Sequence, residues 1–418
     1  MRATRRWVVV GAGVVGVCVA SFLVRDGYEV TLLDPNDAGT GASSGNAGGL
    51  NPASIVPMAT PGIIWSVPRW LADPLGPLTV RWTALPRLAP WIWRFHNSSS
   101  LDRVEAAARS LRGLLSPCFD LLLPLADQAQ ASHLLRRLGG LYVYRSRGAL
   151  AKSSFAWELR RRNGVELEEL DAASIRRIEP ALSADYACGI RVQENGHTLD
   201  PQGLVQALAG ACVRAGVSVI RGRALGFRMD GNRLVAVRTD EGDIDADGAV
   251  IAAGVHSRAL ARDLGNNLPL ESERGYHLMI RDPEVHLHHS VMDGEGKFVA
   301  TGMAGGLRIA GTVELAGVQA PPDWRRARIL AQHAHRMIPD LPPAYDPGRM
   351  DVWMGHRPSM PDSLPVIDRS VRCPQVIYAF GHGHVGLTAA PMTGRIVADL
   401  AAGRPAPIDL SPFRATGR

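Results

Sequence analysis

Lysine is scarce in this sequence, and its cysteines form no metal-binding pattern. Lys152 and Lys297 are the only two lysines among 418 residues, so arginine supplies nearly all of the positive charge behind the net charge of +6. The arginines are scattered, which is more typical of a solvated surface than of a nucleic-acid-binding protein. There is no C-x-x-C pair and no H-E-x-x-H motif, so we predict no metal site, and reduced thiols in a reducing compartment. The five cysteines are Cys18, Cys118, Cys188, Cys212 and Cys373.

The composition excludes a disordered chain and a transmembrane bundle. Hydrophobic residues make up 46% of the sequence, within the range of globular proteins. A charge-free run from Trp7 to Val24 follows Arg5 and Arg6 and would suit a membrane span or a signal peptide. Three glycines spaced for a turn, the lack of an A-x-A cleavage signal and a second strand directly afterwards argue against both. We therefore expect a cytoplasmic protein, with two domains at this length.

The beginning of the chain contains a dinucleotide-binding fingerprint in its full context. Trp7–Val10 is a short apolar run suited to a buried parallel strand, and residues 14–26 are predicted as a helix with Gly27 at its C-terminal cap. A second strand, Glu29–Leu33, ends at Asp34. The G-x-G-x-x-G motif alone is a weak indicator, but the two strands and the acidic residue make it a strong one.

Each residue of the fingerprint has a physical role. Gly11 permits a tight turn, Gly13 lets the backbone approach a pyrophosphate, and Gly16 lets the helix pack closely against the sheet. The free amides and the dipole of the helix then face the phosphates. Asp34 is placed to accept hydrogen bonds from the ribose of an adenosine.

A stretch rich in proline and tryptophan runs from about Pro52 to Asn97. It has three interpretations: a membrane-surface patch, a cover over a substrate pocket, or ordinary packing of short helices broken by prolines. The tryptophans and the interleaved arginines are Trp65, Trp70, Trp82, Trp91, Trp93, Arg69, Arg81, Arg87 and Arg94.

The α/β pattern fades near residue 90 and returns near residue 190. Residues 101–138 have helical periodicity, and Asp171 and Asp200 are expected to cap the N-termini of helices. A hairpin turn is expected at Asp230–Gly231. The segment Asp247–Ser257 is predicted to be a buried strand that runs into a glycine, which suits close passage of the backbone past a nucleotide.

A second glycine-rich turn lies near the C-terminus. Residues 354–370 are predicted to form a polar loop with three prolines, followed by a short strand, Val376–Phe380. Glycines 381, 383 and 386 open a helix that runs to about Ala402. Such a turn directs the N-terminus of a helix at an electron-rich group.

Six motifs, taken in the order in which they occur along the chain, resemble those of the D-amino-acid oxidase superfamily of FAD-dependent oxidoreductases. The closest likeness is to its D-amino-acid dehydrogenase branch, which includes D-proline and D-hydroxyproline dehydrogenase-like members. The motifs are GAGVVG with Asp34, SSGNAGGLNP, DGAVIAAGVHS, ERGYH, GHRPSMPDSLPVI and GHGHVGLT. The resemblance covers nearly the whole chain and implies an α/β fold (α+β overall). A discontinuous Rossmann-like FAD-binding domain would comprise residues 1–90, 190–267 and 348–418. A substrate domain with a mostly antiparallel sheet would comprise residues 91–189 and 268–347.

The resemblance also implies the positions of cofactor and substrate. Arg357, in GHRP, would grip the substrate carboxylate, a task that suits a planar guanidinium. Tyr276, His277 and Phe298 would line the substrate pocket, with simple packing as an equal alternative. The candidate catalytic residues are Arg357, Tyr276 and His382. The residues expected to bind FAD are Gly11, Ala12, Gly13, Val14, Val15, Gly16, Asp34, Ser43, Ser44, Asn46, Ala47, Gly48, Gly254, Gly381, His382, Gly383, Gly386, Leu387 and Thr388.

The implied reaction is oxidative deamination of a D-amino acid, with D-proline or D-hydroxyproline-like substrates included. Hydride would pass from Cα to the flavin, and the electrons to a quinone or another acceptor, in amino-acid catabolism. Some relatives hold the flavin through a cysteine near the start of GHRP, where this chain has Gly355 and His356, so non-covalent FAD is expected. The alternatives are a glycine or sarcosine oxidase that produces hydrogen peroxide, an FAD-binding subunit and a tRNA-modifying oxidoreductase. No nucleic-acid partner is expected, and the stretch 52–97 allows peripheral contact with the inner face of the cell membrane.

Overall fold

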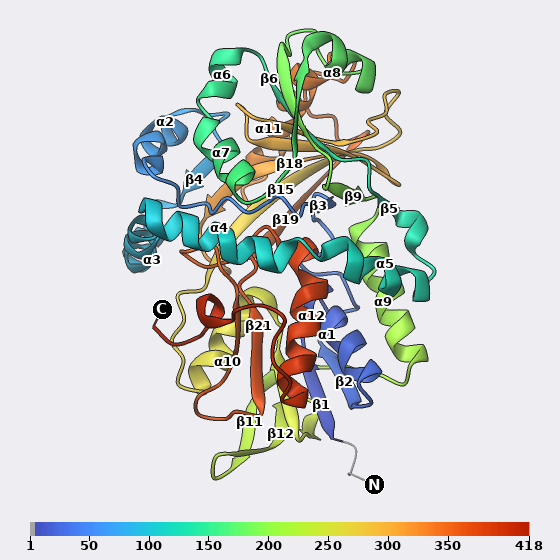
Figure 1. The fold of residues 1–418 in the computed structure, drawn as a ribbon, viewed down its shortest axis with the longest axis vertical. Coiled ribbons are helices and arrows are strands. Elements are labelled where there is room, and N and C mark those ends of the chain that lie inside the picture. Colours follow the sequence, from blue (N-terminus) through green and yellow to red (C-terminus); the bar gives the residue numbers. More distant parts are fainter. Residues whose placement is uncertain (1–4, 418) are drawn as a thin grey trace.

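The computed structural model describes residues 5–417, so residues 1–4 and 418 of the predicted domain ranges lie outside the described residues. Its lower half in Figure 1 is built on a six-stranded sheet whose pairs are parallel except β20 with β21. Short apolar runs such as that of β1 form its buried strands, as expected for a sheet covered on both faces. In spatial order the strands are β10 (Ser218–Arg221), β2 (Glu29–Asp34), β1 (Arg6–Val10), β14 (Gly248–Ile251), β21 (Val376–Phe380) and β20 (Val366–Arg369).

Helices cover one face of this sheet and a small antiparallel sheet covers the other. On the first face lie α1 (Val14–Arg25), α9 (Pro201–Arg214) and α12 (Gly386–Ala402), with α4 (Leu101–Leu115) and α5 (Cys118–Gln128) across α12 (Figure 1). A Cβ at Gly394 would lie 2.8 Å from the backbone of Cys18, so α12 and α1 pack closely because this position is glycine. On the other face lie β11 (Ala224–Asp230), β12 (Arg233–Thr239), β13 (Gly242–Asp245) and α10 (Ser257–Asp263).

The upper half is built on a larger, mostly antiparallel sheet, with α11 (Arg325–Met337) packed on one face. The strands, in order, are β19 (Met350–Ser359), β15 (Glu271–Ile280), β18 (Gly306–Leu315), β17 (Phe298–Met303), β16 (Ser290–Asp293), β6 (Gly140–Tyr144), β8 (Cys188–Val192) and β7 (Leu167–Asp171), and β4 (Leu78–Val80) also pairs with β18. A third sheet joins β3 (Gly49–Leu50), β9 (Gly196–Thr198) and β5 (Leu135–Arg136). The other α-helices are α2 (Val67–Ala72), α3 (Leu85–Asn97), α6 (Arg147–Ala151), α7 (Ser154–Arg162) and α8 (Ala172–Ile178).

The α/β fold and several local predictions are confirmed. Asp171 accepts a hydrogen bond from Ser174 N at 2.8 Å at the start of α8, and Asp200 accepts one from Gly203 N at 2.9 Å at the start of α9. β11 and β12 form the hairpin predicted around Asp230–Gly231. No helix in residues 5–417 combines the length and hydropathy needed to cross a membrane.

The prediction of a loop over residues 354–370 is wrong at both ends. Residues 354–359 belong to β19, which pairs with β15 in a regular antiparallel register, and Val366–Arg369 form β20, which pairs with β21. The proline in this strand is tolerated because β19 is an edge strand and Pro358 needs no amide donor on its open side.

Sheet membership refines the division into domains. β4 falls in the range 1–90 and β19 in the range 348–418, yet both pair within the larger sheet. We therefore propose a division in which residues 78–80 and 350–359 join the substrate domain, and the last FAD-binding segment begins near residue 360.

Candidate functional site

The candidate site lies at the carboxyl edge of the six-stranded sheet. β1, β2, β14 and β21 are parallel, so the turns that follow them meet at one edge. β1 lies in the middle, and the connections leave it toward β2 on one side and toward β14 and β21 on the other. Such a switch point is where open α/β sheets bind ligands.

The first glycine-rich turn has the steric properties that the sequence predicts. Gly11 has a φ of +110°, and a side chain there would collide with the carbonyl of Ala252 at the end of β14. A methyl group at Gly16 would overlap the carbonyl oxygen of Gly11, so the first turn of α1 can pack against this turn only with glycine at position 16. At Gly13 a Cβ would meet only Ser43 Oγ, at 3.5 Å, so the turn is open toward the ligand side.

Three amides at this turn are free to bind an anion. Val14 N donates to Ser43 Oγ at 3.1 Å and Val17 N to the carbonyl of Gly13 at 3.0 Å. The neighbouring amides of Gly13, Val15 and Gly16 have no acceptor among residues 5–417. Free amides at a helix N-terminus are a site for phosphate groups.

Asp34 lies at the end of β2, beside this turn, as predicted. Its Oδ2 accepts a hydrogen bond from Ala12 N at 2.8 Å, and its Oδ1 accepts one from Asn36 N at 2.9 Å. The carboxylate is therefore held in place by the turn that it adjoins. Its contact with a ribose stays a prediction.

The segment from Ser43 to Gly48 passes between the two large sheets. Arg308, on β18, donates to the carbonyls of Ser44 at 3.1 Å and Asn46 at 2.6 Å. Desolvation lowers the pKa of Arg308 to about 10, with Asp200 opposing the shift, so the guanidinium remains charged at neutral pH. Sequence analysis missed Arg308, because only the pairing of β18 brings this strand to the segment.

The second glycine-rich turn lies beside the first. Thr388, in the first turn of α12, accepts a hydrogen bond from Asn51 N at 2.9 Å, so the chain after Gly48 is tied to this helix. The amides of Gly386, Leu387 and Thr388 have no acceptor in the described chain, whereas Ala389 N donates to the carbonyl of Val385. α12 thus presents a second set of free amides.

Gly254 and Gly381 also lie at this edge. Gly254, just after β14, has a φ of +56° and open space where a side chain would be. Gly381 follows β21 with a φ of +87°, and Gly383 N donates to the carbonyl of Pro358 at 2.8 Å. The second turn therefore holds the end of β19.

Arg357 lies on the face of the larger sheet that meets these turns. β19 pairs Arg357 with Glu273, Gly355 with Gly275 and Trp353 with His277, so the side chains of the other four residues share one face with the two glycines between them. A Cβ at Gly275 would overlap the guanidinium of Arg357, which therefore lies flat over this glycine. The guanidinium is half-buried and has no hydrogen-bond or ion-pair partner among the described residues. Desolvation lowers the pKa of Arg357 and the charge of Glu273 opposes this.

His277 lies on the same face and contacts the segment Ser43–Gly48. Its Nδ1–H donates to the carbonyl of Gly45 at 3.0 Å, and its ring stacks on Trp353 at 5.0 Å between centroids. Desolvation lowers the pKa of His277 to about 3, so the ring is neutral at physiological pH. Trp353 was not predicted as a site residue, although it fills the space next to Gly45.

The structure does not bring Tyr276 to this site. Side chains alternate along β15, so Tyr276 points to the opposite face of the sheet from Arg357. Its hydroxyl donates to Glu314 and accepts from Asp323 N at 2.9 Å. Burial raises the pKa of Tyr276 to about 12, so the hydroxyl stays protonated. The assignment of Tyr276 to the pocket is therefore corrected to a structural role.

Phe298 and His382 are also engaged elsewhere. Phe298 packs against His333 of α11, with 4.9 Å between the ring centroids, on the far face of the larger sheet. The hydroxyl of Thr393 donates to the carbonyl of Ala389, so it accepts the Nε2–H of His382 at 3.0 Å. Desolvation lowers the pKa of His382 to about 3. The catalytic assignment of His382 and the pocket assignment of Phe298 are therefore wrong for their side chains, since both are buried in packing.

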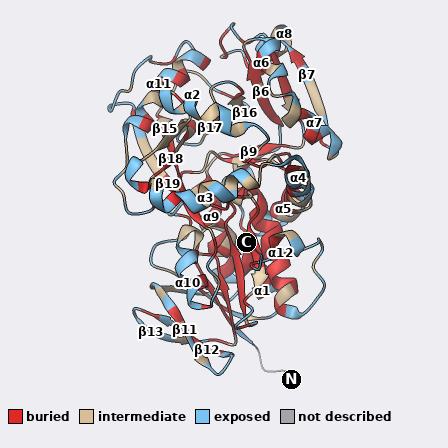
Figure 2. Cartoon of the chain, turned by 90° about the vertical axis from the view of Figure 1, so that its left-hand side faces the viewer, coloured by how far each residue is buried: buried red, intermediate tan, exposed pale blue. Residues whose placement is uncertain are grey.

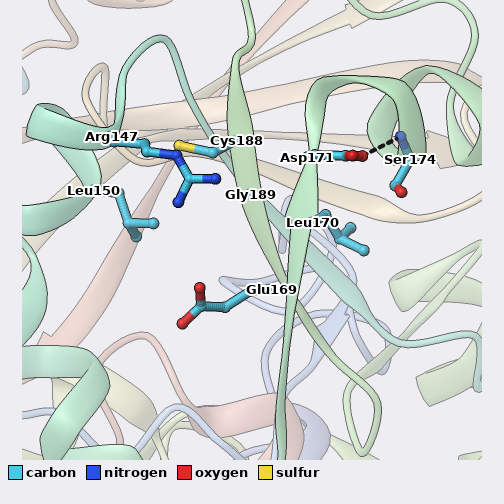
Figure 3. Close-up of a pocket in the computed structure, with 8 residues that line it drawn as sticks. All are labelled: Arg147, Leu150, Glu169, Leu170, Asp171, Ser174, Cys188 and Gly189. Carbon is cyan, nitrogen blue, oxygen red and sulfur yellow. Dashed lines mark hydrogen bonds between the residues drawn. The ribbon is translucent and has the colours of Figure 1, made fainter.

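A separate cavity of about 260 Å³ lies far along the larger sheet, between α6, β7, α8 and β8 (Figure 3). Figure 3 shows Asp171 on the wall of this cavity, where its carboxylate accepts the hydrogen bond from Ser174 N that caps the N-terminus of α8. None of the residues predicted for the site lines this cavity. It is therefore distinct from the candidate site.

The edge with the two turns fits FAD. The open approach at Gly13 and the free amides of α1 suit a pyrophosphate, and the amides of α12 suit the electron-rich pyrimidine edge of a flavin. The stretch Ala42–Gly48 passes between them, with Ala47 and Ser44 half-buried along it.

Comparisons with known proteins agree with this geometry. Residues 6–400 match the family described as FAD dependent oxidoreductase. The chain is 44% identical to a D-amino-acid oxidase of Bradyrhizobium diazoefficiens, over 99% of this chain and 98% of that protein. It is 33% identical to a D-amino acid dehydrogenase of Paramagnetospirillum magneticum, over 96% of each. The crystal structure of a glycine oxidase from Geobacillus kaustophilus has the same fold, with a TM-score of 0.74 and 22% identity over 99% of this chain and 100% of that one.

Proposed function

Because the chain belongs to the family of FAD-dependent oxidoreductases, we propose that it catalyses the oxidative deamination of a D-amino acid. The observation that carries the proposal is the unpartnered guanidinium of Arg357 on the sheet face that meets the two glycine-rich turns. The relatives named D-amino-acid oxidase and D-amino acid dehydrogenase support the same reaction.

In this reaction the chain's residues bind and orient the substrate. Arg357 accepts the carboxylate in a bidentate pair, and its position flat over Gly275 fixes the direction of the fork. His277, held neutral and hydrogen-bonded to Gly45, helps to close the site against the segment Ser43–Gly48. FAD, when bound, supplies the acceptor for the hydride from Cα. Orientation of the substrate is the main contribution of the protein.

The proposal is tested by anaerobic mixing of the purified yellow protein with a panel of compounds. The panel contains D-amino acids, D-proline and D-hydroxyproline, glycine, sarcosine and the L-enantiomers. Bleaching of the flavin band by D-amino acids, with L-enantiomers inactive, is the expected result. Bleaching by none of the panel would exclude the proposed function.

A glycine-type oxidase is the second candidate, favoured by the shared fold with glycine oxidase. The panel separates it, because glycine and sarcosine would then bleach the flavin fastest. The electron acceptor is a separate question. We propose a quinone or a similar acceptor. Stoichiometric hydrogen peroxide on aerobic turnover would establish oxygen instead, as the name of the 44%-identical relative, D-amino-acid oxidase, suggests.

We also propose that FAD is bound without a covalent bond. The neighbourhood of Arg357 offers Gly355 and His356, and the five cysteines are all buried. Acid or detergent denaturation should release all of the flavin into the supernatant. Flavin that stays on the denatured chain would contradict this.

We further propose that the face bearing α2 and α3 contacts an anionic membrane surface. Trp65, Trp82 and Trp93 are 85%, 79% and 65% exposed, and Figure 2 shows α2 and α3 on one side of the molecule. Arg69 of α2 and Arg94 of α3 are exposed near these tryptophans. Asp73 is the only acidic residue between residues 38 and 101, so positive charge predominates in this stretch. Tryptophan beside arginine is typical of membrane interfaces. Charge complementarity therefore favours anionic lipid.

Co-sedimentation with phosphatidylglycerol vesicles tests the membrane proposal. Wild-type protein should sediment with these vesicles at low salt and remain in solution with neutral phosphatidylcholine vesicles. The triple variant Trp65→Ser, Trp82→Ser, Trp93→Ser should lose binding while its flavin reduction is unchanged. Equal sedimentation of variant and wild type would refute a role for this face.

A further inference from the structure

Glu273 is a buried carboxylate directly opposite Arg357. The two residues pair across β15 and β19, so their side chains share the face of the sheet that meets the two glycine-rich turns. The side chain of Glu273 is 8% exposed. Glu273 is the first residue of the ERGYH motif, but it was not predicted as a site residue, because only the register of the two strands places it beside Arg357.

One oxygen of this carboxylate is satisfied and the other is free. Glu273 Oε2 accepts a hydrogen bond from the hydroxyl of Ser359 at 2.6 Å. In the described chain, no donor contacts Oε1, and no hydrogen bond or ion pair joins it to Arg357. The charges of the two groups are nevertheless close enough to influence each other, since Glu273 opposes the lowering of the pKa of Arg357.

Two opposite charges without protein partners are available to a ligand here. A charge that is taken out of water is costly unless a partner replaces the water, so a ligand that displaces solvent must supply partners for both groups. Arg357 and Glu273 could have paired with each other but do not, because the guanidinium lies over Gly275. A ligand that carries both a carboxylate and an ammonium group would satisfy both residues at once.

We propose that Glu273 is the residue that binds the ammonium group of the substrate and accepts a proton from it. This inference rests on the proposed function. In the step, an N–H bond of the ammonium breaks, its electron pair stays on nitrogen, and an O–H bond forms at Oε1 of Glu273. The products are a neutral amine and a neutral carboxylic acid, and no electrons are transferred. The amine then carries the lone pair that departure of hydride from Cα requires.

The pairing also defines a substrate class. A zwitterion supplies an opposite charge to both Arg357 and Glu273, whereas a simple carboxylate leaves Glu273 without a donor and a 2-hydroxy acid offers it only a neutral hydroxyl. Sites built around buried polar groups discriminate strongly against ligands that leave them unsatisfied. The site therefore selects amino and imino acids over hydroxy acids of the same shape.

Other polar and charged groups face Glu273. Arg357 and Ser359 face it from β19, and His384 faces it from the turn before α12. His384 is exposed, and the charge of Glu273 acts to raise its pKa whereas the charges of Arg357 and Arg160 act to lower it.

The test compares the holoenzyme with the variant Glu273→Gln, which keeps the shape and the hydrogen bond from Ser359. Two matched ligand pairs are used: D-alanine with propanoate, and D-proline with cyclopentanecarboxylate. Binding of the amine-free acids is followed by the shift of the flavin spectrum, and the reaction of the amino acids by kcat/KM as a function of pH. Ser359→Ala serves as a control that removes the hydrogen bond but not the charge.

The variant Glu273→Gln should affect amino acids and amine-free acids in opposite directions. In Glu273→Gln, kcat/KM for the amino acids should fall about 100-fold at pH 7, as for loss of a general base, and should recover as the pH approaches 10. The same variant should bind propanoate and cyclopentanecarboxylate at least as tightly as the wild type, because a repelling charge has been removed. Ser359→Ala, which removes the hydrogen bond but keeps the charge, should lower kcat/KM less than Glu273→Gln and should leave the pH profile in place.

Two results would overturn the inference and are distinguishable from failure of the proposed function. If Glu273→Gln weakens amino acids and amine-free acids equally, Glu273 only positions Arg357. If the variant retains the wild-type pH profile, Glu273 accepts no proton. In both cases the wild type still reduces its flavin with D-amino acids. If the wild type reacts with no amino acid, the proposed function falls first and this inference with it.

Discussion

Arg357 carries the binding of the substrate carboxylate in the proposed reaction, because no other free guanidinium in the described chain lies on the sheet face that meets the glycine-rich turns. Arg357 is half-buried over Gly275, so its guanidinium is partly desolvated but has no partner among the described residues. A carboxylate that enters the site therefore gains charge-assisted hydrogen bonds in a weakly screened environment.

We predict that Arg357→Ala raises KM for the amino acid about 100-fold, since two charge-assisted hydrogen bonds contribute roughly 3 kcal/mol. Flavin content should stay at the wild-type level, because Arg357 contacts neither glycine-rich turn. Steady-state kinetics and the ratio of absorbance at the flavin and protein bands measure both. Arg357→Lys should fall between wild type and alanine, and near-normal kinetics in Arg357→Ala would remove the residue from the site.

A matched pair of glycine variants separates folding from cofactor binding. Gly13→Ala should fold normally, because its Cβ meets only Ser43 Oγ, but should bind FAD at least tenfold more weakly since the methyl group stands where the pyrophosphate approaches. Gly16→Ala should lower the melting temperature of the protein, because its Cβ would overlap the carbonyl of Gly11. Circular dichroism and FAD titration distinguish the two. Similar behaviour of both variants would contradict the assigned roles.

Local chemistry explains which site residues could be predicted from the sequence. The fingerprint glycines, Asp34 and the N-cap Asp200 act through neighbours a few residues away or through turns that the motif itself defines, and they lie where expected. Glu273 and Arg308 act through strands that are paired with distant segments. The ERGYH motif contains Glu273 but does not show which of its residues face the site, and no motif contains Arg308.

At the level of elements, β18 is linked to the segment Ser43–Gly48, which passes between the larger sheet and the edge with the two glycine-rich turns. Arg308 provides this link through two backbone carbonyls. Its replacement would leave both carbonyls and the partly buried segment without their donor. The segment would then lose the geometry that passes it between the two sheets.

We predict that Arg308→Ala weakens FAD binding and lowers the free energy of unfolding by about 2 kcal/mol, the cost of unsatisfied buried acceptors. Flavin fluorescence titration and urea denaturation measure the two quantities. Arg281→Ala is the matched control, because Arg281 makes an exposed ion pair with Asp351 and should change stability by less than about 1 kcal/mol. An Arg308→Ala variant indistinguishable from this control would show that the segment is held by other contacts.

The strands β15 and β19 also show why part of the site prediction was wrong. The ERGYH and GHRP motifs were recognised, but the period of two along a strand sends Tyr276 away from Arg357. The sequence pattern does not reveal which residues of a motif face the ligand, because both faces of β15 are buried. Hydrophobic alternation, the usual indicator of the inward face, is absent there.

For the whole molecule, buried histidines with lowered pKa values make stability depend on pH, and three of them have the largest shifts. Desolvation lowers the pKa of His277 and His382 to about 3 and that of His197 to about 4, from an unfolded value of 6.5. Between these values the unfolded chain binds more protons than the folded one. Stability is therefore constant above pH 6.5 and falls as the pH is lowered toward 3.

We predict that each of these histidines reduces the free energy of unfolding at pH 5 by about 2 kcal/mol relative to pH 7.5. Urea denaturation of the FAD-saturated protein between pH 4.5 and 8 measures the effect. His197→Leu should make the dependence on pH shallower by one proton, and the exposed His96→Ala should leave it unchanged. A profile that is flat between pH 5 and 7 would contradict the buried neutral state.

The strand order of the six-stranded sheet has a consequence for biosynthesis. β21, which pairs with β14, and α12, which carries the second set of free amides, both come from the last part of the chain. A nascent polypeptide on the ribosome therefore has only one half of the coenzyme cradle until translation is nearly complete. Capture of the coenzyme becomes one of the last events of maturation, and a prematurely terminated product should emerge colourless.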